Sequence, residues 1–207
     1  MPLRRRAPEA RPQQILDAAF HEFGERGLAG ARLDDIARRA GVAKGTIYLY
    51  FPNKEALFRE MIRTTIVDAI ANGEAQRDEA DDLASAESLL RQLAAAWWRF
   101  LREERVHTLQ RLVMAELRQF PDLMAFYASE VIARGRRLVS GIIERGVARG
   151  EFRLVDPMIA ARMYSALWMS HATWAANRPL HPTLGSDEQI LDEMLEFYLH
   201  ALRPRPS

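Results

Sequence analysis

Apolar residues recur three and four positions apart along most of the chain, the spacing that places them on one face of an α-helix. No stretch shows the sustained alternation of apolar and polar residues that is typical of a half-buried strand. The sequence therefore predicts an all-α fold. Helices are expected to begin near Pro12, Leu33, Lys44 and Asn53, and further helices are expected at roughly 84–104, 105–119, 122–148, 156–177 and 187–202.

The limits of the first helices follow from residues that favour helix ends. Pro12 suits a first helical residue because a backbone N–H there would have no intrahelical partner, and Gly24 and Gly27 are expected to end this helix. Gly41 suits the end of the second helix, since glycine adopts the left-handed conformation at little cost. Asn53 is expected to cap the fourth helix through its side chain.

The last two expected helices carry more apolar residues than one buried stripe can hold. The first has Met158, Ile159, Met163, Ala166, Leu167 and Met169, and the second has Ile190, Leu191, Met194, Leu195, Phe197, Tyr198, Leu199 and Leu202. Each helix would then bury one face inside the chain and the other against a second copy. The pattern predicts a symmetric four-helix interface in a homodimer, with Leu195 and Tyr198 among its contacts.

The composition limits the classes of protein to which the chain could belong. Its 207 residues suffice for one large domain or two modest ones with a buried core. The absence of cysteine excludes disulfides, thiolate metal sites and cysteine nucleophiles. Because we find neither an export signal nor an apolar run of about 18 residues, we expect a cytoplasmic protein with no membrane partner.

The net charge is only +1, but the charges are unevenly distributed. Residues 1–54 hold ten Lys or Arg and six Asp or Glu, a local excess of +4, whereas residues 72–88 hold six Asp or Glu and one Arg. Both lysines of the chain, Lys44 and Lys54, lie in the basic part. The sequence therefore predicts a basic N-terminal unit followed by an acidic junction.

The segment 33–54, LDDIARRAGVAKGTIYLYFPNK, combines two short helices with a tight turn. In a helix-turn-helix, the second helix enters the major groove of DNA and its N-terminal residues meet base edges. Residues 44–51 would form this recognition helix, with Ile47 and Phe51 facing the protein and Lys44 and Thr46 able to reach bases or phosphates. An ordinary helical hairpin is the alternative, which the spacing and the basic residues disfavour.

The run from Gln14 to Phe58, and above all DIARRAGVAKGTIYLYFPNKEALF, closely resembles the DNA-binding domain of TetR-family transcriptional regulators. The stretch AELRQFPDLMAFYASEVIARGRRLVSGIIERGVARGEF, followed by DPMIAARMYSALW, resembles the C-terminal domain of the AefR-like branch. The resemblance implies a DNA-binding domain at 1–54 and an effector-binding and dimerisation domain at 55–207. It also implies a homodimeric, ligand-responsive repressor that binds a palindromic operator of double-stranded DNA and is released by a small-molecule effector.

Carried over by position, the DNA contacts of the family fall on Arg32, Lys44, Gly45, Thr46, Tyr48, Tyr50 and Lys54. The chain departs from the family pattern before each of the two motif helices. Ala31 and Arg32 stand where a pair of hydroxyl residues is usual, and Ala43 stands where a capping Ser or Thr is common. We therefore expect neither helix to have a hydroxyl cap, and Arg32 could contact phosphate instead.

The C-terminal part is rich in aromatic and Met residues, which suit an apolar or aromatic effector. The resemblance implies an effector site there, although most such residues in a helical domain belong to the core. Tyr164, Trp168 and His171 lie at four- and three-residue steps on one helix face and could form a wall together. The full set of expected effector contacts is Trp97, His107, Met114, Glu116, Tyr127, Tyr164, Trp168 and His171.

An enzyme is not expected, because the five histidines show no metal-ligand spacing and no phosphate-binding glycine loop or nucleophile motif is present. We expect no catalytic residues, no metal and no cofactor. Two alternatives to a repressor remain open. One is a helical ligand-binding or scaffold protein that does not use its motif, and the other is an activator with the same architecture.

Overall fold

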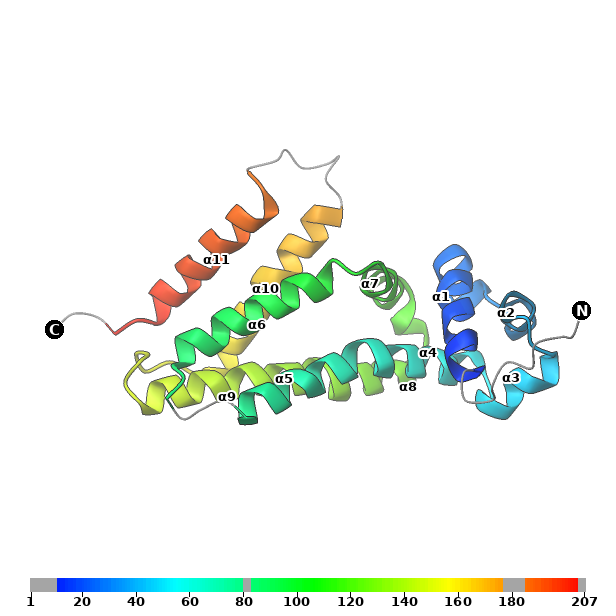
Figure 1. The fold of residues 1–207 in the computed structure, drawn as a ribbon, viewed down its shortest axis with the longest axis horizontal. Helices are drawn as coiled ribbons and strands as arrows, with labels where there is room; N and C mark the ends of the chain where they lie inside the picture. Colours follow the sequence, from blue (N-terminus) through cyan, green and yellow to red (C-terminus); the bar gives the residue numbers. More distant parts are fainter. Residues whose placement is uncertain (1–10, 80–82, 177–184, 205–207) are drawn as a thin grey trace, which may run out of the picture. The chain divides into compact units, whose positions relative to one another are not determined.

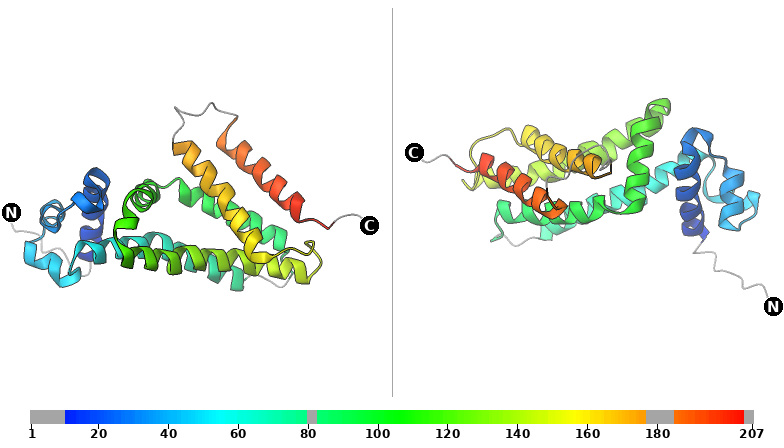
Figure 2. Two further views of the ribbon diagram at one scale, coloured as in Figure 1. Left: turned by 180° about the vertical axis from the view of Figure 1, so that it is seen from behind. Right: turned by 90° about the horizontal axis from the view of Figure 1, so that it is seen from above.

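The computed structural model describes residues 11–79, 83–176 and 185–204, and every regular element in these ranges is a helix, so the all-α prediction is confirmed (Figures 1 and 2). The elements are α1 (Arg11–Gly30), α2 (Leu33–Ala40), α3 (Lys44–Tyr50), α4 (Lys54–Ile62), η2 (Arg63–Val67), α5 (Asp68–Glu79), α6 (Ala86–Leu101), α7 (Glu104–Glu116), η3 (Leu117–Gln119), α8 (Pro121–Tyr127), η4 (Ala128–Ala133), α9 (Arg134–Ala148), α10 (Pro157–Ala176) and α11 (Asp187–Leu202). Across these ranges, no helix combines the length and apolarity needed to cross a membrane.

The helices form two compact units. The first contains the residues up to 68 together with 104–129, and the second contains 69–103 together with 130–207. This division does not coincide with a boundary at residue 54, because α1 packs against α4 and α7, and α4 packs against α8. The boundary at residue 54 therefore stays a prediction about function.

The N-terminal helices begin and end close to the expected residues. Gly41 has left-handed dihedrals (φ 66°, ψ 32°) at the end of α2, and the Asn53 side chain accepts a 2.7 Å hydrogen bond from the Ala56 amide at the start of α4. The expectation that Gly24 ends the first helix was wrong, since α1 continues through it. Gly27 instead kinks the helix, with φ 73° and ψ 170°.

The expected acidic junction at 72–88 is helical as far as Glu79, because α4 continues through the π-helix η2 into α5. Contacts within the second unit stabilise this polar helix. Ile70 is buried, and Arg134 of α9 donates to both carboxylate oxygens of Glu74 at 2.6 to 3.0 Å. These hydrogen bonds hold the pKa of Glu74 below its usual value. Tertiary packing therefore overrides the weak helical pattern of α5.

In the second unit, α9 packs against α10 and α6, and α11 packs against the same two helices. The Tyr198 hydroxyl donates to the Ala160 carbonyl at 2.7 Å, and the side chains of Leu195 and Tyr198 are each only 7% exposed. Both therefore belong to the core of the chain, and the expectation that they contact a second copy was wrong. Among the described side chains of α10 and α11, the exposed apolar ones are Met158, Ile159, Met163, Ala166, Phe197 and Ala201, with Met169 and Trp174 toward the end of α10.

Gly146 allows a close approach of neighbouring residues in this core. A Cβ at this position would collide with the ring of Phe152 and lie 2.8 Å from the Cβ of Ala86. At Gly141 of the same helix, the nearest atom is the end of the flexible Arg77 side chain, at 3.4 Å. The two glycines therefore differ in the space around them and not in secondary structure.

We expect Gly146→Ala to lower the free energy of unfolding by up to about 2 kcal/mol, because overpacking costs about 1–3 kcal/mol and the gain in helix propensity returns only about 1 kcal/mol. The midpoint of thermal unfolding should fall by up to roughly 8 °C. Gly141→Ala is the matched control and should leave the midpoint unchanged or raise it. Circular dichroism melts test this, and equal midpoints for the two variants would contradict the packing argument.

Candidate nucleic-acid interface

Two helices of the first unit, α2 and α3, form a helix-turn-helix around a three-residue turn. The Val42 amide donates to the Ala37 carbonyl at 3.0 Å, which closes the end of α2 in the manner of a glycine C-cap. On α3, Ile47 is fully buried and the following Phe51 is 7% exposed. Their predicted inward orientation is confirmed, and it leaves the opposite side of α3 for a partner.

The outward side of α3 is formed by residues that the sequence singled out, together with one that it did not. Tyr48 and Tyr50 are exposed, and no described atom would lie within 4 Å of a Cβ at Gly45. Leu49, which is absent from the predicted contacts, is 83% exposed. Its position two residues after the inward-facing Ile47 could have indicated this, because residues two apart point to different sides of a helix.

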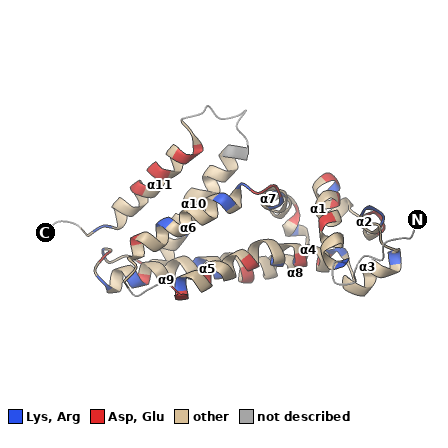
Figure 3. Cartoon of the chain, viewed as in Figure 1, with Lys and Arg blue, Asp and Glu red and all other residues tan. Residues whose placement is uncertain are grey.

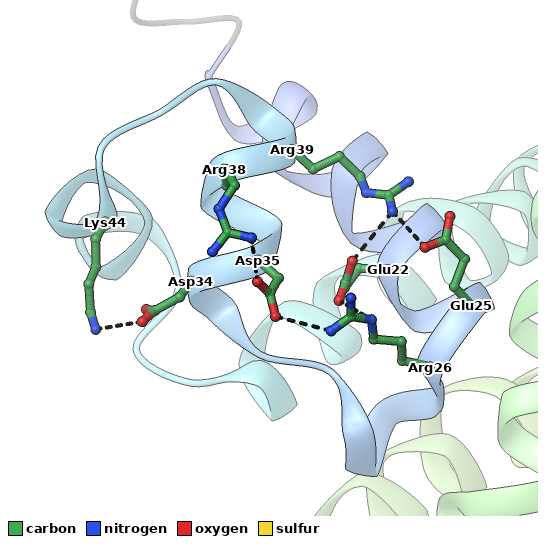
Figure 4. Close-up of polar contacts among 8 residues, drawn as sticks. All are labelled: Glu22, Glu25, Arg26, Asp34, Asp35, Arg38, Arg39 and Lys44. Atoms are coloured by element: carbon green, nitrogen blue, oxygen red, sulfur yellow. Dashed lines mark hydrogen bonds and ion pairs between the residues drawn. The ribbon is translucent and has the colours of Figure 1, made fainter.

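The two lysines have partners within the first unit. The Lys44 ammonium lies 2.7 Å from the Asp34 carboxylate of α2, and this hydrogen bond raises the pKa of Lys44 (Figure 4). The Lys54 ammonium donates to the Ala29 carbonyl at 2.7 Å. Arg32 is exposed at the start of α2. Within the described residues, neither Arg32 nor Ala43 makes a side-chain cap, as the departures from the family pattern predicted.

Charged side chains fix α2 against α1, and both helices carry residues of both signs (Figures 3 and 4). Glu22 of α1 is only 2% exposed and pairs with Arg26 at 3.1 Å and with Arg39 at 3.6 Å. Arg39 also contacts Glu25 at 2.6 Å, and Arg26 contacts Asp35 at 3.3 Å. A buried carboxylate needs such partners, so the network disfavours other positions of α2 on α1.

The expected effector contacts fall in both units. In the second unit, Tyr164 lies 5.9 Å from Trp97 and 5.5 Å from Trp168 between ring centroids, and its hydroxyl donates to the Leu90 carbonyl at 2.7 Å. Burial raises the pKa of Tyr164 well above its ordinary value. The structure therefore brings Trp97, Tyr164 and Trp168 together in an apolar cluster with a neutral phenol.

His171 lies beside this cluster and is 4% exposed, with its ring centroid 5.2 Å from that of Trp98. Its Nε2 atom lies 3.4 Å from an Asp187 carboxylate oxygen. Among the described residues, neither ring nitrogen of His171 nor the indole nitrogen of Trp98 has a hydrogen-bond partner, although all three atoms are buried. Unsatisfied buried polar atoms are costly, so these atoms are candidates for contact with a polar group of a ligand.

The other expected effector contacts belong to the first unit. His107 and Tyr127 are half-buried, and burial raises the pKa of Tyr127. Met114 is 79% exposed. The Glu116 carboxylate accepts hydrogen bonds from the amides of Leu28 at 3.1 Å and Ala29 at 2.7 Å. Both oxygens of the Glu116 carboxylate are therefore already occupied by the protein's own backbone. Across the described ranges, no three His, Asp or Glu side chains gather where they could hold a metal ion.

Two family models match the chain. Residues 15–61 match the model described as bacterial regulatory proteins, tetR family, and residues 88–201 match the model described as AefR-like transcriptional repressor, C-terminal domain. The second match alone covers more than half of the chain.

Individual relatives are similar over nearly the whole length. The Fatty acid metabolism regulator protein of Bacillus subtilis (strain 168) is 27% identical over 181 residues, which cover 86% of this chain and 91% of the relative. The HTH-type transcriptional regulator RutR of Escherichia coli (strain K12) is 26% identical over 210 residues, which cover 98% and 95%. Among solved structures, the transcriptional regulator FadR from Bacillus subtilis in complex with stearoyl-CoA has a TM-score of 0.74 at 26% identity, covering 92% and 99%.

The contact between Lys44 and Asp34 generates a prediction. Asp34→Asn should increase the affinity for duplex DNA of mixed sequence by roughly two- to five-fold at low salt. The reason is that Lys44 would no longer have to leave the Asp34 carboxylate before it contacts a phosphate. The effect should shrink as salt is added. Fluorescence anisotropy measures both. If Asp34→Asn had the same effect in a Lys44→Ala background, Asp34 would act through its own charge and not through Lys44.

Proposed function

Because the chain belongs to the TetR family of bacterial regulatory proteins, we propose that it is a ligand-responsive repressor that binds a palindromic operator as a homodimer. TetR-family members are transcriptional regulators and not enzymes. The observation that carries the proposal is the outward side of α3, where exposed aromatic, apolar and basic groups stand on a helix that Ile47 holds in place.

The proposed DNA contacts divide into two groups. Lys44 and Thr46 begin the recognition helix and are suited to base edges, and Gly45 between them lets the backbone approach the DNA. To these we add Leu49, whose exposed side chain suits the methyl group of thymine. Phosphate contacts, which position the protein without reading sequence, are assigned to Arg32, Tyr48, Tyr50 and Lys54.

The proposed dimer interface lies on α10 and α11. Ile159, Met163 and Ala166 are exposed at four- and three-residue steps along α10, and Phe197 of α11 is 80% exposed. Such an apolar row suits an isologous contact with the same row of a second copy. In a dimer, the two recognition helices would enter major grooves about one helical turn apart, roughly 34–36 Å, which explains why the operator should be palindromic.

The proposed effector is a small, mainly apolar or aromatic molecule with a polar group. Trp97, Tyr164 and Trp168 offer apolar contacts, and the buried nitrogens of His171 and Trp98 offer polar ones. The FadR structure, which contains stearoyl-CoA, supports a ligand with an apolar portion. The effector would lower DNA affinity only by binding the non-DNA-binding conformation better, with α4 connecting the effector domain to the DNA-binding helices.

The function is tested by selecting bound sites from randomised duplex DNA with the purified full chain at near-physiological salt. We expect an enriched palindrome whose half-sites are about 10–10.5 base pairs apart, centre to centre, or a multiple of that spacing. Transcription from a promoter that contains this site should rise when the protein is removed, whereas a fall would identify an activator. Salt-sensitive binding without an enriched sequence would instead favour a scaffold or ligand-binding protein that does not use its motif.

The interface is tested by Met163→Glu combined with Phe197→Glu. Both side chains are exposed in the single chain, so the double variant should fold normally but sediment as a monomer, with much weaker operator binding. Met114→Glu is the matched control, because Met114 is also an exposed methionine but lies on α7, outside the proposed interface. A double variant that remains dimeric would refute this interface.

A further inference from the structure

The kink in α1 interrupts the hydrogen-bond ladder of the helix that carries the network around Glu22. Gly27 has dihedrals outside the helical region, so the amides that follow it resemble those of a helix first turn, which lack intrahelical acceptors. The chain then makes one further turn, in which the Ala31 amide donates to the Gly27 carbonyl at 3.2 Å, before α2 begins at Leu33. Residues 24–31, called the Gly27 joint below, therefore determine how the chain leaves α1 and enters α2.

Helix α7 supplies partners on both sides of the interruption. After the kink, the Glu116 carboxylate accepts from the amides of Leu28 at 3.1 Å and Ala29 at 2.7 Å, which gives these two donors a charged acceptor. Before the kink, the Arg111 guanidinium donates to the Gly24 carbonyl at 3.3 Å. The two side chains are five residues apart on one helix. Helix α7 thus caps both broken ends of α1.

The fit between Gly27 and Glu116 is close. A Cβ at position 27 would collide with the Glu116 carboxylate, and a φ of 73° already disfavours any other residue there. Gly24 likewise lies against α7, since a Cβ there would be 3.4 Å from the Thr108 methyl group. In addition, Lys54 at the start of α4 donates to the Ala29 carbonyl. The joint is therefore held by α7 and α4 together.

We propose that Glu116 is a positioning residue for DNA binding, which holds the Gly27 joint in the form that orients α2 and α3 for the operator. The inference rests on the proposed function, because it concerns affinity for an operator. Glu116 itself carries a negative charge and touches backbone amides of the protein. Its contribution to DNA binding is therefore geometric, and it opposes the effect that its charge alone would have on a polyanion.

The test uses the full chain with Glu116→Gln, which removes the charge and leaves a single acceptor oxygen in a side chain of the same length. Three quantities are measured: affinity for the duplex selected by the wild type, affinity for a duplex of mixed sequence, and hydrogen exchange of the Leu28 and Ala29 amides without DNA. We expect faster exchange of both amides and operator affinity weaker by roughly 5- to 150-fold, the usual range for coupling between sites. Affinity for the mixed-sequence duplex should stay the same or rise.

Glu104→Gln is the matched control, because it removes the same charge from an exposed residue at the other end of α7. This variant should leave unchanged the hydrogen exchange of the Leu28 and Ala29 amides and the ratio of the affinities for the two duplexes. Glu116→Asp keeps the charge but shortens the side chain by one methylene. The carboxylate would then no longer reach the Leu28 and Ala29 amides, so this variant should also weaken operator binding. This second variant keeps the proposal testable should Glu116→Gln be poorly folded.

The outcomes separate the inference from the proposed function. A wild type that selects an operator, with a Glu116→Gln variant that binds it equally well or more tightly, would overturn the inference alone. A parallel loss of affinity for both duplexes would also overturn it, since that result indicates general destabilisation. If the wild type selected no operator, the proposed function would fall and this inference with it.

Discussion

The position of the recognition helix depends on the burial of Ile47 and Phe51. Helix α3 has seven residues, and an isolated helix shorter than roughly 12–15 residues is barely stable in water, so α3 owes its existence to this packing. Burial of one such side chain contributes about 1.5–3 kcal/mol, which is enough to hold the helix but not to choose its orientation. The edge-on contact of Phe23 with Phe58, at 5.8 Å between ring centroids, belongs to the same core.

Orientation comes from polar contacts that tolerate few alternatives. Glu22 is buried and needs its arginine partners, so a shift of α2 along α1 would leave a carboxylate without compensation. Exposed pairs such as Lys44 with Asp34 add little stability, so the proposed contact of Lys44 with a DNA phosphate would cost little when it replaces the pair. Apolar burial thus stabilises the helix-turn-helix, buried charges position α2 on α1, and exposed charges remain available for a partner.

Local signals along the chain predicted those features whose causes are local. Gly41 and Asn53 mark helix ends by their own conformation and hydrogen bonding, and the inward residues of α3 follow from helical spacing. Features with causes far along the chain were missed or misjudged. The polar helix α5 is stabilised by α9 through Glu74 and Arg134, and Gly27 rather than Gly24 interrupts α1 because Glu116, 89 positions further on, binds the amides beyond it. Neither partner can be identified from the residues around the feature, so both required the structure.

The hydrogen bonds of the Gly27 joint are strong enough to matter for coupling between sites. Hydrogen bonds to a charged group contribute about 1.5–3 kcal/mol each, so one of the two that Glu116 accepts already matches the coupling of about 1–3 kcal/mol that is typical between two ligands. Helix α6, which carries Trp97 and Trp98 among the proposed effector contacts, leads through Arg102 and Glu103 directly into α7. The chain therefore connects the proposed effector contacts to Glu116 through one helix and a short turn.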